Sequence, residues 1–170
     1  MKTNWIRTGL ATLGLLMAPS VFAATDTATG TVSVTVVPEA SITVSTNPTL
    51  TSTGTEFASY TGNTTYNYKY RTTTAGGAGA VTVTVTTEFA AASGILTGHL
   101  SHVASTTGVA TANAVSTTAA VTATGLLTFA TATNSIDAGD TGTIAWTLVN
   151  LPTHNTGAAS TTVTLTITAT

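Results

Sequence analysis

The chain has 170 residues, a formal net charge of −2 and no cysteine, and only 6% of its residues are charged. Without cysteine there is no disulfide, no thiolate-bound zinc or iron–sulfur cluster and no thiol nucleophile. Beyond the first 23 residues, Lys69 and Arg71 are the only cations. The sequence therefore has no basic patch, and we expect no nucleic-acid partner.

Residues 1–23 have the organisation of a secretory signal peptide. Lys2 and Arg7 precede an apolar run, and Ala23 ends the Val-Phe-Ala sequence that predicts cleavage. The run is too short to cross a hydrocarbon core of ~30 Å, and no second run of this kind follows. We expect a secreted protein without a membrane span, which passes the periplasm in transit and ends at the cell surface or outside the cell.

The segment that follows the leader alternates between valine and small polar residues. Val32, Val34 and Val36 point to one side of an extended chain, and Pro38 interrupts the pattern because it has no N–H to donate. Within residues 24–37, this segment is either a strand donated to a neighbouring molecule or the first strand of its own fold. The sequence leaves both interpretations open.

Short alternating segments separated by turns continue to the end of the chain and predict strands. Threonine, a β-branched residue that favours strands, makes up about a quarter of the sequence. Residues 24–170 are therefore predicted to form one all-β domain, a single antiparallel immunoglobulin-like β-sandwich, with a closed barrel as the alternative. The expected strands are Gly30–Val37, Ser41–Ser45, Thr55–Tyr60, Thr64–Thr73, Ala80–Phe89, one between Ile95 and Val103, Ala119–Thr124, Leu126–Ala130, Thr143–Val149 and Ala159–Thr170.

Two local pairings and one core residue are also predicted. Gly62-Asn63 indicates a turn, and Phe57 would anchor the short strand before it. The glycine-rich stretch after Thr73 predicts a hairpin between Thr64–Thr73 and Ala80–Phe89. Trp146, between two apolar neighbours at alternate positions, is expected in the core.

Tyr66, Tyr68 and Tyr70 share one face of a predicted strand. Two interpretations are open. The three rings form a packing face with hydroxyls that reach water, or they form a platform on which sugar rings stack. Lys69 and Arg71 on the opposite face favour packing.

The polar residues do not assemble a recognisable catalytic or metal centre. No serine lies in a nucleophile-elbow pattern, so we expect no enzyme activity and no cofactor. His99 and His102 are three apart in a region without helical periodicity, which indicates solvated loop histidines, and His154 is distant in sequence. Asp137 and Asp140 lie in a glycine-containing stretch typical of a turn, and two carboxylates are too few for calcium.

The layout resembles secreted pilin or fimbrial filament subunits that assemble by donor-strand exchange. The shared features are the signal peptide, the alternating N-terminal segment, the succession of short strands and the alternating C-terminal segment with Val163, Leu165 and Ile167. Such subunits commonly have a penultimate aromatic residue and a disulfide, whereas this chain has Ala169 and no cysteine. The resemblance covers the two ends of the chain better than its middle.

Two function classes follow. The first, which the resemblance implies, is a structural subunit of an extracellular filament, pilus or surface layer. It would form a homopolymer in which Val32, Val34 and Val36 enter a neighbour and Pro38 ends the donated segment, with a periplasmic chaperone as a partner in transit. The alternative is a monomeric secreted adhesin or carbohydrate-binding module that uses Tyr66, Tyr68 and Tyr70.

Overall fold

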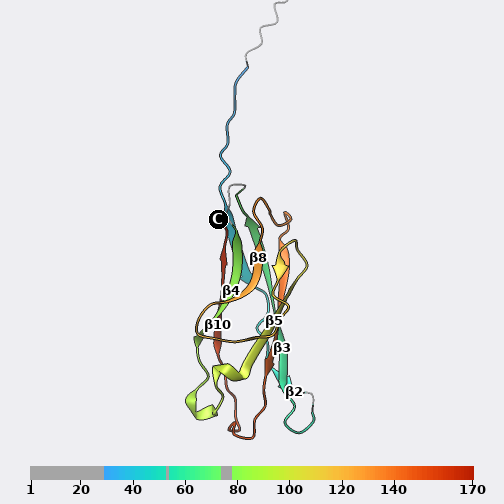
Figure 1. Cartoon of the computed structure of the whole chain (residues 1–170), viewed down its shortest axis with the longest axis vertical. Helices are drawn as coiled ribbons and strands as arrows, with labels where there is room; N and C mark the ends of the chain where they lie inside the picture. The colour runs from blue at the N-terminus through green and yellow to red at the C-terminus, as the bar shows by residue number, and fades with distance from the viewer. Residues whose placement is uncertain (1–28, 53, 74–77) are drawn as a thin grey trace, which may run out of the picture. The chain divides into compact units, whose positions relative to one another are not determined.

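The computed structural model describes residues 29–52, 54–73 and 78–170, and two antiparallel sheets in it enclose one apolar core (Figure 1). The predicted all-β antiparallel sandwich is confirmed. Thr35–Thr170 form the compact unit that contains both sheets. The predicted signal peptide, residues 1–23, lies outside the described residues.

The first sheet is built around two long neighbouring strands, β3 and β9. In spatial order its strands are β1 (Glu39–Val44), β3 (Tyr60–Arg71), β9 (Asp140–Leu148), β5 (Leu100–Thr106) and β7 (Thr117–Thr118), and β2 (Thr51–Ser52) also pairs with β3. Every pairing is antiparallel. Val/Thr-rich and aromatic strands of this kind pack well on a pleated surface.

The second sheet has four antiparallel strands, and β10 lies beside β4 in Figure 1. Its spatial order is β10 (Thr162–Thr168), β4 (Gly79–Thr87), β8 (Thr124–Phe129) and β6 (Thr111–Ala112). Two single-turn 3₁₀ helices, η1 (Ala91–Ser93) and η2 (Thr97–His99), precede β5. The described part of the chain contains no α-helix.

The hairpin predicted across the glycine-rich stretch is wrong. β3 pairs with β1, β2 and β9, whereas β4 pairs with β10 and β8 in the other sheet. Each strand is central in its own sheet, so both of its hydrogen-bonding edges are occupied. The chain between them therefore crosses from one sheet to the other, and the apolar rows of both strands meet in one core.

The turn and strand predicted around Gly62 are also wrong. β3 begins at Tyr60 and runs through Gly62 and Asn63. A side chain at Gly62 would crowd Pro48, the carbonyl oxygen of Thr49 and the Leu50 side chain, so this position inside the strand leaves little room for one. Phe57 is 59% exposed with a φ of 53°, so it belongs to the preceding turn and anchors no strand.

The predicted strand Ala119–Thr124 is mostly a connection, because β7 ends at Thr118 and β8 begins at Thr124. By contrast, Trp146 lies in the core as predicted and is 4% exposed. Its indole Nε1–H donates to Thr64 Oγ1 at 2.8 Å. The buried indole therefore keeps its hydrogen bond, as buried tryptophans usually do.

Candidate assembly site

Gly30–Val37, called the arm below, has the sequence of a strand but does not form one. Every residue of the arm lacks strand assignment, and within the described residues it takes part in no strand pairing. Val32 is 98% exposed, Val34 83% and Val36 58%. The interpretation in which the arm is the first strand of its own sandwich does not fit these observations.

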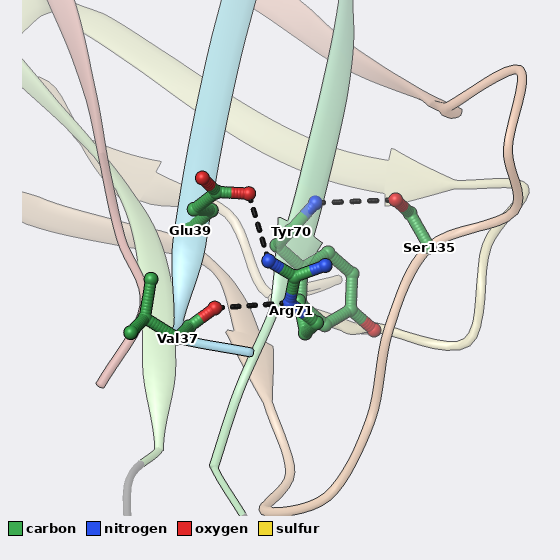
Figure 2. Close-up of polar contacts among 5 residues, drawn as sticks. All are labelled: Val37, Glu39, Tyr70, Arg71 and Ser135. Carbon is green, nitrogen blue, oxygen red and sulfur yellow. Dashed lines mark hydrogen bonds and ion pairs between the residues drawn. The ribbon is translucent and has the colours of Figure 1, made fainter. Parts of the chain in front are cut away.

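Pro38 separates the arm from the sandwich, because β1 begins at the next residue, Glu39. Pro38 has no N–H for a ladder, so the strand pattern of the arm does not continue into β1. Figure 2 shows how Arg71 holds the chain on both sides of the proline. Its Nε–H donates to the carbonyl oxygen of Val37 at 2.9 Å, and its Nη2 contacts Glu39 Oε2 at 2.8 Å.

The position of Arg71 depends on the register of β1 and β3, in which Glu39 lies opposite Arg71. The other side of β3 is held at the same point, because the Tyr70 N–H donates to Ser135 Oγ at 3.1 Å (Figure 2). The Arg71 and Glu39 side chains are 44% and 70% exposed, and exposed pairs of this kind contribute less than about 1 kcal/mol to folding. This contact links the residues on both sides of Pro38 to the end of β3 and adds little stability.

The three tyrosines are core residues of β3. Tyr66, Tyr68 and Tyr70 are 0%, 1% and 4% exposed. The Tyr70 ring stacks on Phe129 of β8, with ring centres 3.8 Å apart and planes 6° from parallel. Burial raises the pKa of Tyr66 and of Tyr68. The burial supports packing, but the Tyr66 and Tyr70 hydroxyls are themselves buried, so they do not reach water as predicted. A sugar platform needs exposed ring faces, which these tyrosines do not present.

The histidines are arranged differently from the solvated loop predicted for them. His102 is 2% exposed on β5, where its ring lies against Trp146, and burial lowers the pKa of His102. His99 and His154 come together, with His99 Nδ1 and His154 Nε2 3.0 Å apart. His99 Nδ1 also accepts the Leu96 N–H, so His154 Nε2 is the donor, and the pair connects η2 with the loop that contains His154.

The two aspartates lie in different surroundings. Asp137 is exposed in a turn, as predicted, whereas Asp140 is 6% exposed and opens β9, where it lies opposite Tyr68. Across the described ranges, no group of three or more histidine or acidic side chains is arranged to hold a metal ion.

Comparisons with known proteins identify no relative. No protein-family model, no curated protein and no solved structure matches this chain. Residues 29–52, 54–73 and 78–170 include no helix with the length and apolarity needed to cross a bilayer. The features of the chain that bear on function are the arm, its attachment at Pro38 and the edges of the sheets.

Sequence reasoning identified the arm but missed Arg71 as its attachment. The features of the sequence that could have indicated this attachment are Glu39, directly after Pro38, and Arg71, at the end of a predicted strand. These two residues are 32 positions apart, and only the β1–β3 register brings them together.

Proposed function

We propose that this chain is a structural subunit of an extracellular filament, and that its copies are joined by donation of the arm from each subunit to the next. The observation that carries the proposal is the state of the arm. It has the alternation of a half-buried strand, yet Val32 and Val34 are almost fully exposed and the arm forms no strand in its own chain.

The alternation explains why the arm would bind a sheet rather than remain solvated. In an extended chain Val32, Val34 and Val36 lie on one side of the arm, and its polar side chains lie on the other together with Val37. Such a segment adds to an open sheet edge through main-chain hydrogen bonds and buries alternate side chains. Each valine that becomes fully buried contributes about 1.5–3 kcal/mol.

The attachment at Pro38 supports donation to another subunit. The Arg71 contacts to Val37 and Glu39 hold the base of the arm and do not involve Val32, Val34 or Val36. The base is therefore fixed to the sandwich, while the apolar side of the arm remains available for a partner. A subunit with both a fixed body and an available strand can join head to tail into an open polymer.

Residues 1–23 would direct the chain out of the cytoplasm before assembly, and the filament would lie outside the cell. During transit, an exposed valine row and an open sheet edge would favour premature association. We include in the proposal a periplasmic chaperone that covers this surface until the subunit is delivered. The expected homopolymer carries no cofactor and has no enzyme activity.

The test compares the secreted full chain with a variant that lacks residues 30–37. We expect the full chain to form filaments visible by electron microscopy and large assemblies in light scattering. The deletion variant should be secreted as a folded monomer with the same β-sheet circular dichroism spectrum. If both chains are monomers, or both form the same filaments, the proposal is wrong.

A further inference from the structure

The outer face of the second sheet carries a row of threonines on each of two neighbouring strands. Val81, Val83 and Val85 of β4 are buried, so the residues between them point away from the core. β10 lies beside β4 with the same alternation, and its apolar side chains pack against the core (Figure 1). The outward residues, called the threonine face below, are Thr82, Thr84 and Thr86 on β4 and Thr164, Thr166 and Thr168 on β10.

The register of the two strands aligns these rows into a grid. Thr164 lies directly opposite Thr84, and Thr166 lies directly opposite Thr82. The irregularity in this pairing, at Thr162, lies beyond the grid. Neighbouring strands are about 4.8 Å apart, and alternate residues of one strand are about 6.7 Å apart, because the rise per residue is about 3.3 Å. The threonine side chains therefore repeat at two fixed distances.

The threonine face presents hydroxyl groups without charge. β4 and β10 contain no charged residue, whereas β3 of the first sheet carries Lys69 and Arg71 on its outer side. Thr86 and Thr164 lie within hydrogen-bond distance of each other. The other hydroxyls at the centre of the grid have no hydrogen-bond partner within the described residues. Each hydroxyl can donate one hydrogen bond and accept two, so the grid can bind a partner that does both.

These properties restrict the ligand. An uncharged face has no electrostatic attraction for a nucleic acid or for an anionic membrane. It has no aromatic ring on which a sugar could stack. A second copy is also a poor match in area. β10 has seven residues, so the two strands cover about 23 Å by 10 Å, or about 230 Å². Stable interfaces bury about 800 Å² on each partner.

An ordered lattice of water molecules fits the grid in both chemistry and spacing. The oxygen atoms at a face of an ice crystal lie in rows whose short repeat is close to the distance between neighbouring strands. Their long repeat is close to twice the rise per residue. Neighbouring strands are rotated by only about 20–25°, so a patch of two strands departs little from a plane.

We propose that the threonine face binds ice. The threonine hydroxyls donate hydrogen bonds to lattice water and accept them from it, and the methyl groups fill the spaces between them. A bound chain blocks the addition of water at the place where it lies, so the expected activity is inhibition of ice growth. The inference does not depend on strand donation and adds an activity to the proposed function.

The test measures the partition of the secreted full chain between ice and liquid. A shell of ice grows slowly in a dilute solution of the chain and a small dye, and the protein and the dye are measured in both fractions. Growing ice excludes ordinary solutes, so a chain that binds the crystal surface is enriched in the ice fraction relative to the dye. If the chain remains in the liquid as completely as the dye, the inference is wrong.

A matched pair of variants tests the assignment to this face. Thr84→Lys places a long charged side chain at the centre of the grid, and Thr143→Lys makes the same change on the outer side of β9 in the first sheet. Both positions are half-buried on central strands, so the two variants have the same charge and similar surroundings. Thr84→Lys should lower the enrichment in ice at least about tenfold, because the lysine obstructs a flat contact, while Thr143→Lys should retain it.

Equal enrichment of both variants, or equal loss, would overturn the assignment. Circular dichroism establishes that each variant is folded. Thr166→Lys, at an exposed position of β10, repeats the test if Thr84→Lys does not fold. Binding to insoluble polysaccharide, or concentration-dependent light scattering, that Thr84→Lys abolishes in a chain excluded from ice would assign the face to a carbohydrate or to a second copy and contradict the inference.

The outcomes also separate this inference from the proposed function. If the unsubstituted chain forms filaments but is excluded from ice, ice binding is wrong and strand donation remains supported. If the chain is monomeric and enriched in ice, ice binding is supported and the filament is not. The variant that lacks residues 30–37 should be enriched in ice as well as the full chain, because the threonine face does not include the arm.

Discussion

Replacing Val32, Val34 and Val36 together with threonine should prevent assembly without changing the stability of the isolated subunit. Threonine keeps the β-branched shape and the strand preference of valine but adds a hydroxyl that resists burial. In the subunit these valines are 98%, 83% and 58% exposed. Substitutions at such positions usually change the free energy of unfolding by less than about 0.5 kcal/mol.

The expected effect on assembly is much larger. If each valine is buried in a neighbour, each replacement removes about 1.5–3 kcal/mol from the subunit junction. The single variant Val34→Thr should therefore weaken association about 10- to 100-fold, and the triple variant should weaken it by more than about a thousandfold. This difference should move the onset of assembly out of the accessible concentration range for the triple variant.

The assay is light scattering over a dilution series, combined with thermal melting of the dissociated subunit followed by circular dichroism. The matched control, Thr31→Ser/Thr35→Ser, changes the polar side of the same segment and should assemble at nearly the concentration of the original chain. The reasoning is refuted if the triple variant assembles normally. It is also refuted if the isolated triple variant melts several degrees lower, because the valines would then be packed in their own fold.

Arg71→Gln removes the contacts to Val37 and Glu39, so we expect a loss of less than about 1 kcal/mol in the free energy of unfolding of the subunit. In light scattering, the lag before assembly should be longer than for the control Lys69→Gln. Equal lags would contradict the role of Arg71 at the base of the arm. Burial lowers the pKa of His102, so the unfolded chain binds the proton more readily and the free energy of unfolding should fall as the pH drops below about 6.5. In urea titrations at several pH values, the free energy of unfolding of His102→Phe should depend less on pH. The same pH dependence in both chains would exclude His102 as the cause. The Tyr66 hydroxyl is buried with no hydrogen-bond partner among the described residues, whereas Tyr68 OH lies 2.6 Å from Thr106 Oγ1. Tyr66→Phe should thus be neutral or stabilising, Tyr68→Phe should cost about 0.5–1.5 kcal/mol, and the reverse order in urea unfolding would contradict this distinction.

The alternation of apolar residues in a predicted strand indicates which of its faces is buried. In β4, Val81, Val83 and Val85 lie in the core, as do Ile144 and the predicted core residue Trp146 of β9. The side chains of a strand alternate between two faces, so a period of two in the sequence directly indicates the buried side.

The partners of each strand could not be predicted in the same way. Pairing is a long-range choice, and a glycine-rich stretch between two good strands indicates a hairpin equally well when the chain actually crosses between sheets. For the same reason His99 and His154, which are 55 residues apart, appeared unrelated in sequence. The contact of Arg71 with Glu39 likewise depends on the register of β1 and β3.

The tyrosine row shows a different limit of the sequence. Its period of two placed Tyr66, Tyr68 and Tyr70 on one face but contained no information on what covers that face. The cover comes from the opposite sheet, where Phe129 of β8 stacks on two of the rings. Gly142, opposite Tyr66 on β9, leaves room for that ring, since a side chain there would overlap it.

Hydrogen exchange of the arm amides tests most directly whether its valine side is buried in another copy. The amides of Thr31, Ser33 and Val37 should exchange rapidly in dissociated subunits, because the arm forms no strand there. In assembled material, ladder hydrogen bonds with a sheet edge of the neighbouring subunit should slow the exchange of alternate arm amides by several orders of magnitude. Rapid exchange in both states, or equal protection in the isolated subunit, would contradict strand donation.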